Sequence, residues 1–147
     1  MPAVMIGPAI VVVQAASAFD PQVAANGTRF TVVWERLADE FQGDVFAVTY
    51  DHTGKKLIVA KAIDETADTT QSFDPSISVT GNGTIVAGLE SIGNGLRSGA
   101  RYELLGTTGN PTGIPLDLSP SPPPGVPQNS GALPVVAGLT TGRFLGV

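Results

Sequence analysis

A short motif in this sequence returns 54 residues after its first occurrence. Phe19-Asp20-Pro21-Gln22-Val23 reappears as Phe73-Asp74-Pro75-Ser76-Ile77. Each copy leads through an Asn-Gly or Gly-Asn turn into an apolar run that ends in glutamate, at residues 30–35 in the first copy and 85–90 in the second. Such turns supply the positive φ that tight hairpins need, so each copy is predicted to form a β-hairpin.

The similarity between the two copies continues beyond the hairpins. Residues 43–48 resemble residues 99–104 at an offset of 56, which predicts a third strand in each copy. A fourth strand is predicted at residues 56–62, with a weaker equivalent at residues 114–118. The sequence therefore predicts an all-β fold built from antiparallel four-stranded repeat units of about fifty-five residues each.

Three segments of the chain are distinguished. Residues 1–118 are predicted to be a β-repeat domain with an N-terminal strand and two complete units. Residues 119–133 contain five prolines, which do not suit pairing in a sheet, so they are predicted to be an arm or linker. This arm is interpreted either as a solvated loop or as a strap that carries the next segment onto a neighbouring subunit. Residues 134–147 repeat the opening hairpin and are predicted to be a partial third unit.

Composition supports strands and excludes several classes of function. Of the 147 residues, 42% are hydrophobic and 14% charged, which suits a folded chain, and 18 glycines and 12 prolines favour turns over helices. With a net charge of −5 and eight dispersed Lys and Arg residues, nucleic acid is not an expected partner. The lack of cysteine excludes disulfides, thiolate metal sites and thiol nucleophiles.

The N-terminal region is apolar from residue 4 to residue 13. This stretch is shorter than the roughly 20 residues of a membrane-spanning helix, so no membrane span is expected. Ala16-Ser17-Ala18 has the form of a signal-peptidase site, but no Lys or Arg precedes the apolar stretch. The β-branched run at residues 10–13 favours a strand over residues 9–15, which resembles the fourth strand of a unit.

The size of the unit limits the possible architectures. Four strands in about fifty-five residues correspond to a β-propeller blade, which buries both faces only when neighbours stack on it. Two and a half units are too few to close a propeller of four or more blades. The chain is therefore expected to form a two-sheet sandwich or to complete itself by pairing with other copies. Open strand edges favour the homo-oligomer.

A family resemblance rests on strand and turn residues. Pro-x-Val-Ala, an aromatic strand ending in Trp34-Glu35, and then Gly43-Asp44-Val45-Phe46 resemble tandem β-repeats of large bacterial surface and adhesin-like proteins. The resemblance covers residues 19–118 and, weakly, residues 134–147. It implies an extracellular β-structure. The chain differs from such proteins in its short length and in lacking the glycine–aspartate nonapeptides that bind calcium.

The titratable residues indicate no reactive site. His52, the single histidine, lies in a predicted turn at residues 51–54 and is interpreted as solvated, because the repeat supplies no partners for a triad base or a zinc ligand. Asp39, Glu40 and Asp44 form an acidic cluster after Trp34. A carboxylate pair or a calcium site is conceivable there, but solvated surface acids are the simpler interpretation.

Other candidates receive the same interpretation. Asp64, Glu65 and Asp68 are taken as solvated acids, and Gly93-Asn94-Gly95 as a hairpin connection without the Lys-Ser/Thr of a phosphate loop. The aromatic residues alternate within strands and are predicted to be core, although one exposed ring would suffice to stack on a sugar. They are Phe30, Trp34, Phe46, Tyr50 and Tyr102. No catalytic, cofactor-binding or metal-binding residue is therefore expected.

Three functions from different classes are considered. The first is a non-catalytic structural protein of an assembled particle, such as a bacteriophage decoration or tail-accessory protein at the virion surface, with copies of itself or other structural proteins as partners. The second is an adhesin or glycan-binding module at the cell surface, as the resemblance implies. The third is a propeller-type hydrolase, which requires a convergent acid cluster. The first is preferred, and no enzymatic activity is expected.

Overall fold

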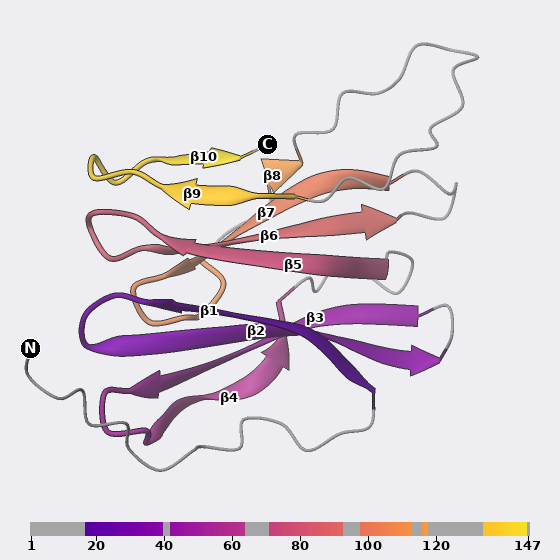
Figure 1. Ribbon diagram of the computed structural model, residues 1–147, viewed down its shortest axis with the longest axis horizontal. Coiled ribbons are helices and arrows are strands. Elements are labelled where there is room, and N and C mark those ends of the chain that lie inside the picture. The colour runs from indigo at the N-terminus through magenta and orange to yellow at the C-terminus, as the bar shows by residue number, and fades with distance from the viewer. Residues whose placement is uncertain are drawn as a thin grey trace, which may run out of the picture.

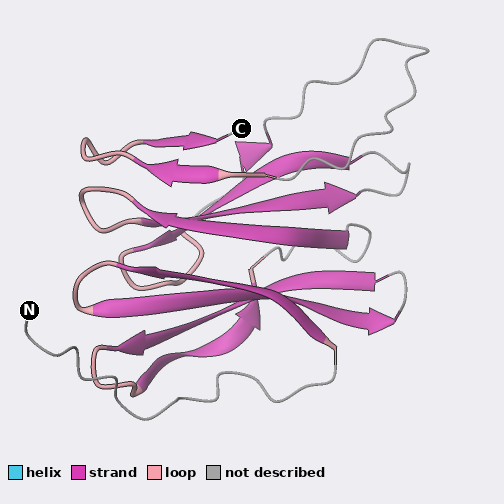
Figure 2. Ribbon diagram, in the orientation of Figure 1, coloured by secondary structure: helices cyan, strands magenta, loops and turns pink. Residues whose placement is uncertain are grey.

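The computed structural model describes residues 17–39, 42–63, 71–92, 98–112, 116–117 and 134–146. Figure 2 shows that the regular structure in these residues is all strand, and every strand pairing is antiparallel. The predicted all-β class is confirmed. Within the described ranges, no helix is long and apolar enough to cross a membrane. The predicted N-terminal strand and the proline-rich arm lie outside the described residues, and of the predicted signal-peptidase motif Ala16-Ser17-Ala18 only Ser17 and Ala18 are described, so its cleavage stays a prediction.

The strands form two four-stranded meanders and a hairpin (Figure 1). Unit 1 has the order β1-β2-β3-β4 and comprises β1 (Ala18–Ala25), β2 (Arg29–Asp39), β3 (Gln42–Asp51) and β4 (Lys56–Ala62). Unit 2 has the order β5-β6-β7-β8 and comprises β5 (Gln71–Val79), β6 (Ile85–Ile92), β7 (Ser98–Gly106) and β8 (Leu116–Asp117). Unit 3 is the hairpin of β9 (Val136–Gly138) and β10 (Phe144–Gly146).

The repeat seen in the sequence is a structural repeat. Phe19 pairs with Glu35 and Phe73 with Glu90, and in both units the register shifts immediately after the phenylalanine. The following aspartate has a positive φ in each case, 45° at Asp20 and 48° at Asp74. Aspartate tolerates this left-handed region better than most residues, which explains why both bulges carry it.

The third strands of units 1 and 2, β3 and β7, correspond to each other, but their alignment differs by one residue from the predicted one. Gly43 pairs with Leu37, and the residue in the same position of unit 2 is Ser98, which pairs with Ile92. The match of residue 43 with residue 99 was therefore wrong. Gly43 is required because Phe73 of unit 2 lies against it, and a Cβ at this position would come within 2.8 Å of the phenylalanine Cδ1.

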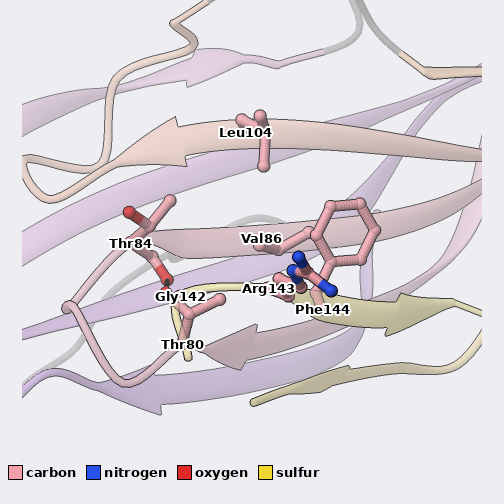
Figure 3. A pocket seen from close by; sticks show the side chains of 7 residues that line it. All are labelled: Thr80, Thr84, Val86, Leu104, Gly142, Arg143 and Phe144. Atoms are coloured by element: carbon pink, nitrogen blue, oxygen red, sulfur yellow. Dashed lines mark hydrogen bonds between the residues drawn. The ribbon is translucent and has the colours of Figure 1, made fainter. Parts of the chain in front are cut away.

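The hairpin β9–β10 is docked on unit 2. The amide of Gly138 donates to the Ser78 hydroxyl at 2.8 Å, and the amide of Gly81 donates to the Leu139 carbonyl at 2.8 Å. The Phe144 ring lies 5.7 Å from the Tyr102 ring. Figure 3 shows Phe144 and Arg143 beside residues of unit 2. The predicted partial third unit is thus present as a two-stranded hairpin.

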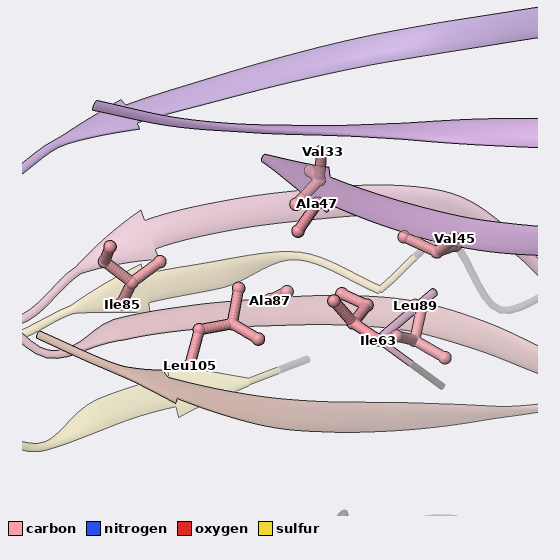
Figure 4. Packing of buried hydrophobic residues seen from close by; sticks show 8 residues of the cluster. All are labelled: Val33, Val45, Ala47, Ile63, Ile85, Ala87, Leu89 and Leu105. Carbon is pink, nitrogen blue, oxygen red and sulfur yellow. The ribbon is translucent and has the colours of Figure 1, made fainter. Parts of the chain in front are cut away.

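The units stack in one direction, so that the front face of each packs on the back face of the unit before it. The front face is defined by the counterparts Phe30, Ile85 and Phe144, each the first residue after the hairpin turn that pairs with the preceding strand. The core between units 1 and 2 joins the back of unit 1 to the front of unit 2 (Figure 4). Its buried members are Val33, Val45, Ala47, Ile63, Ile85, Ala87, Leu89 and Leu105.

The same relation holds between units 2 and 3. Val86 and Tyr102 on the back of unit 2 pack against Val136 and Phe144 of the hairpin. This front-to-back order is how propeller blades stack, whereas a simple sandwich would place two like faces together. Burial of each large apolar side chain contributes about 1.5–3 kcal/mol, so the stacking is a main source of stability for sheets of this size.

Candidate functional site

The histidine turn is structural. His52 is exposed in the turn between β3 and β4, and its backbone N–H donates to the Thr28 carbonyl at 3.1 Å. Asp51 holds the turn, because its Oδ1 accepts hydrogen bonds from the Thr53 hydroxyl at 2.6 Å, the Thr53 amide at 2.8 Å and the Lys55 amide at 3.0 Å. The hydrogen bond from the Thr53 hydroxyl is the main reason why the pKa of Asp51 lies below its ordinary value.

The acidic clusters predicted from the sequence lie mostly outside the described residues. Asp39 ends β2, Asp44 is exposed on β3, and Glu40 is not described. Asp64, Glu65 and Asp68, as well as residues 93–95, are also outside. Their interpretation as solvated acids and as a connection therefore stays a prediction, although the exposure of Asp44 agrees with it.

The aromatic residues are core, as predicted. Trp34, Tyr50 and Tyr102 are buried, and Phe30 and Phe46 are half-buried against them. Phe30 stacks on Tyr50 with ring centroids 5.2 Å apart, and Trp34 stacks on Phe46 at 5.8 Å. These rings are engaged with one another and do not form an open platform. Phe19, by contrast, is 45% exposed.

The structure brings together three carboxylates that were not considered as a group from the sequence. Oxygens of Asp20, Glu35 and Asp74 lie within 4.8 Å of one another. Asp20 and Asp74 occupy the equivalent bulges of units 1 and 2, and Glu35 extends from β2 towards unit 2. Its Oε2 accepts a hydrogen bond from the Asp74 amide at 3.4 Å. The group therefore lies at the contact between the two units.

Burial dominates the electrostatics of this group. Glu35 is 7% exposed, and its pKa is raised above the ordinary value mainly by desolvation. The charges of Asp74 and Asp20 raise the pKa further, whereas the hydrogen bond from the Asp74 amide acts in the opposite direction. Ionisation of Glu35 is thus less favourable in the folded protein than in a free carboxyl group.

Such a group has two chemical possibilities. Three carboxylate oxygens are the ligands that hard divalent cations prefer, and a buried carboxyl beside two carboxylates can also retain a proton. Both the Phe-Asp-Pro motif and the glutamate that ends each apolar run were visible in the sequence. What no local pattern shows is that the glutamate of one unit meets the aspartate of the next.

A cavity of about 430 Å³ lies between unit 2 and the hairpin (Figure 3). Its wall is formed by Thr80, Thr84, Val86, Leu104, Gly142, Arg143 and Phe144. The lining is mainly apolar, with Arg143 as its charged residue. Comparisons of the chain with protein-family models, with curated proteins and with solved structures find no match in any of the three.

Proposed function

We propose that this protein is a non-catalytic structural module that builds an assembly through its stacked repeat units. The observation that carries the proposal lies at the two ends of the stack. Phe73 and Ile77 contact unit 1, whereas their counterparts in unit 1 are Phe19, 45% exposed, and Val23, 64% exposed. At the other end, unit 3 exposes Val135, Leu139 and Leu145 at 57%, 44% and 58%.

Exposed apolar groups at both ends of a stack are typical of interaction surfaces. Inside the chain, the equivalent groups are covered by a neighbouring unit, so the same chemistry is available for contacts with other molecules. An assembled particle, such as a bacteriophage virion with this protein on its surface, is the setting that we propose. The partners are then copies of this chain or other structural proteins of the particle.

Light scattering coupled to size exclusion tests this proposal. We expect a full-length sample to elute as a defined oligomer, and removal of residues 119–147 to dissociate it while unit 1 stays folded by circular dichroism. The deletion uncovers Val86 and Tyr102, so its behaviour is compared with that of Leu145→Lys, which alters an exposed residue and leaves those residues covered. A full-length chain that is monomeric at high concentration would contradict the proposal.

A glycan-binding adhesin is the second candidate, and the exposed ring of Phe19 is the observation that favours it. Binding of the protein to a glycan array, with loss of the signal in Phe19→Ala, is the expected result under this alternative. Phe30→Ala is the matched control, because its ring is half-buried and stacked on Tyr50. Equal signals from the wild type and Phe19→Ala would exclude this role for Phe19.

A further inference from the structure

The strand β10 has an open edge in the described part of the chain. Its counterparts β2 and β6 each pair on both sides, with β1 and β3 or with β5 and β7. β10 pairs with β9, and the Leu139 amide donates to the Arg143 carbonyl at 2.8 Å next to the turn. Because hydrogen-bonded pairs alternate in an antiparallel ladder, the backbone groups of Phe144 and Gly146 face away from β9. Among the residues that the structure describes, no strand pairs with this edge, which therefore presents two donors and two acceptors.

The cavity described above opens beside this edge. Phe144 and Arg143 contribute to its wall from the hairpin, and Leu104 contributes from β7 of unit 2 (Figure 3). In the contact between units 1 and 2, the counterpart of Leu104 is Thr49, which is completely buried. Leu104 is half-buried. The back face of unit 2 thus extends beyond β10. The hairpin therefore covers less of the back of unit 2 than unit 2 covers of the back of unit 1.

Unit 1 shows what fits beside such an edge. Arg29-Phe30 is the counterpart of Arg143-Phe144, and it pairs with Asp51 and Tyr50 of β3. The Tyr50 ring stacks on Phe30 at 5.2 Å, and the acid lies opposite the arginine. In unit 2, Ile85 pairs with Gly106, and Leu105, which precedes it at a register shift, is completely buried between the units. A strand added to β10 in the same register would direct its aromatic side chain into the cavity.

The position also restricts the kind of molecule that fits. A strand beside β10 would lie on the back face of β7, as the position of Leu104 in the cavity wall indicates. On the side that faces β7, the partner therefore has no room for a further layer of structure. Peptide addition of this kind draws its affinity from main-chain hydrogen bonds and its specificity from alternate side chains.

We infer that β10 is the acceptor for an extended segment of a partner chain, which adds antiparallel to its open edge. The segment carries an aromatic residue that enters the cavity next to Phe144 and, following it, an acidic residue opposite Arg143. This inference rests on the proposed assembly role, because it names the kind of contact through which a partner is held. It adds a third strand to unit 3, as β3 does in unit 1 and β7 in unit 2.

The probe is a fluorescein-labelled decapeptide with the sequence of residues 42–51, titrated into the full chain and followed by anisotropy. Hydrogen-bonded pairs alternate along β3 as well, and the His52 amide donates to the Thr28 carbonyl of the facing strand. The backbone groups of Val48 and Tyr50 therefore face β2, and those of Thr49 face β4. We expect saturable binding of the unmodified peptide and of a peptide N-methylated at Thr49. N-methylation at Tyr50 or Val48 should abolish binding, because it removes a donor to β10.

A charge exchange tests the register. Arg143→Glu should weaken binding of the unmodified peptide about two- to fivefold, the range of an exposed ion pair, and Asp51→Lys in the peptide should restore it. Arg143 is exposed, so the variant is expected to keep the fold, which circular dichroism checks.

Several results would overturn the inference. Absence of saturable binding would show that the edge is not open to a partner, and equal binding of all N-methylated peptides would show that β10 is not the acceptor. If the peptide binds only when an oligomer of the protein dissociates, the edge of β10 is occupied by a second copy of the chain and not by a different partner. If the peptide fails to bind but light scattering still finds an oligomer, the assembly role stands and this strand site is wrong.

Discussion

A pair of buried hydroxyls on the back face of unit 1 gives a sharp test of the packing. The hydroxyls of Thr31 and Thr49 lie 2.8 Å apart and form a hydrogen bond, and both residues are completely buried. They lie on the neighbouring strands β2 and β3, in directly paired positions. The turn after β7 covers them, because a Cβ at Gly109 would come within 3.2 Å of the Thr31 hydroxyl.

Replacement of one threonine by valine keeps the volume and removes one partner. The other hydroxyl is then buried without its partner, which costs about 1–3 kcal/mol of the free energy of unfolding. Replacement of both residues removes the polar pair altogether, so we expect the double variant Thr31→Val/Thr49→Val to lie within about 1 kcal/mol of the wild type. The two substitutions should therefore be strongly non-additive.

Urea denaturation of the wild type, the two single variants and the double variant measures this coupling. Thr141→Val is the control, because Thr141 is exposed in the β9–β10 turn and its replacement should change the free energy of unfolding by less than about 0.5 kcal/mol. Additive losses from the two single substitutions would refute the reasoning. They would mean that each hydroxyl has another partner and that the turn of unit 2 does not seal this part of the contact.

Two further predictions concern the contact between units 1 and 2. The raised pKa of Glu35 means that the folded state binds its proton more tightly than the unfolded state, so its contribution to stability falls as the pH rises from 4.5 through the folded pKa. Glu35→Gln should remove this fall and stabilise the protein at pH 7 relative to the wild type; urea denaturation across the pH range measures it, and an unchanged pH dependence would contradict it. Leu89→Ala should lower the free energy of unfolding by about 2–5 kcal/mol, since Leu89 is completely buried between the sheets. Leu57→Ala, at a residue 39% exposed, should lower it by much less, and equal losses would place Leu89 outside the core.

The local elements followed closely from the sequence. The strand predicted at residues 56–62 is β4 with the same bounds, and the turn at residues 51–54 occurs where expected. These features depend on neighbouring residues: β-branched and aromatic side chains favour extended backbone, and glycine or asparagine permits a positive φ. The shift of one residue between the third strands was missed, because register is set by cross-strand pairing and by the packing of Phe73 on Gly43.

The candidate sites were much less visible in the sequence. Asp20 and Asp74 belong to the same motif, yet their proximity to Glu35 depends on how unit 2 is placed on unit 1. The cavity next to Phe144 likewise arises from the docking of a hairpin on a sheet. Neither has a signature in residue spacing, since each joins segments that are far apart along the chain.

The sequence by itself determined that this chain repeats a unit of four antiparallel strands, because alternation, turn residues and a recurring bulge motif are written into neighbouring positions. Tertiary structure alone decided the direction of stacking, the face that Glu35 and the aromatic residues occupy, and the docking of the hairpin on unit 2. The physical reason is that both faces of each sheet are apolar enough to be buried. Which face meets which neighbour is then decided by the fit of side chains across the interface, and not by the local preferences that form the strands.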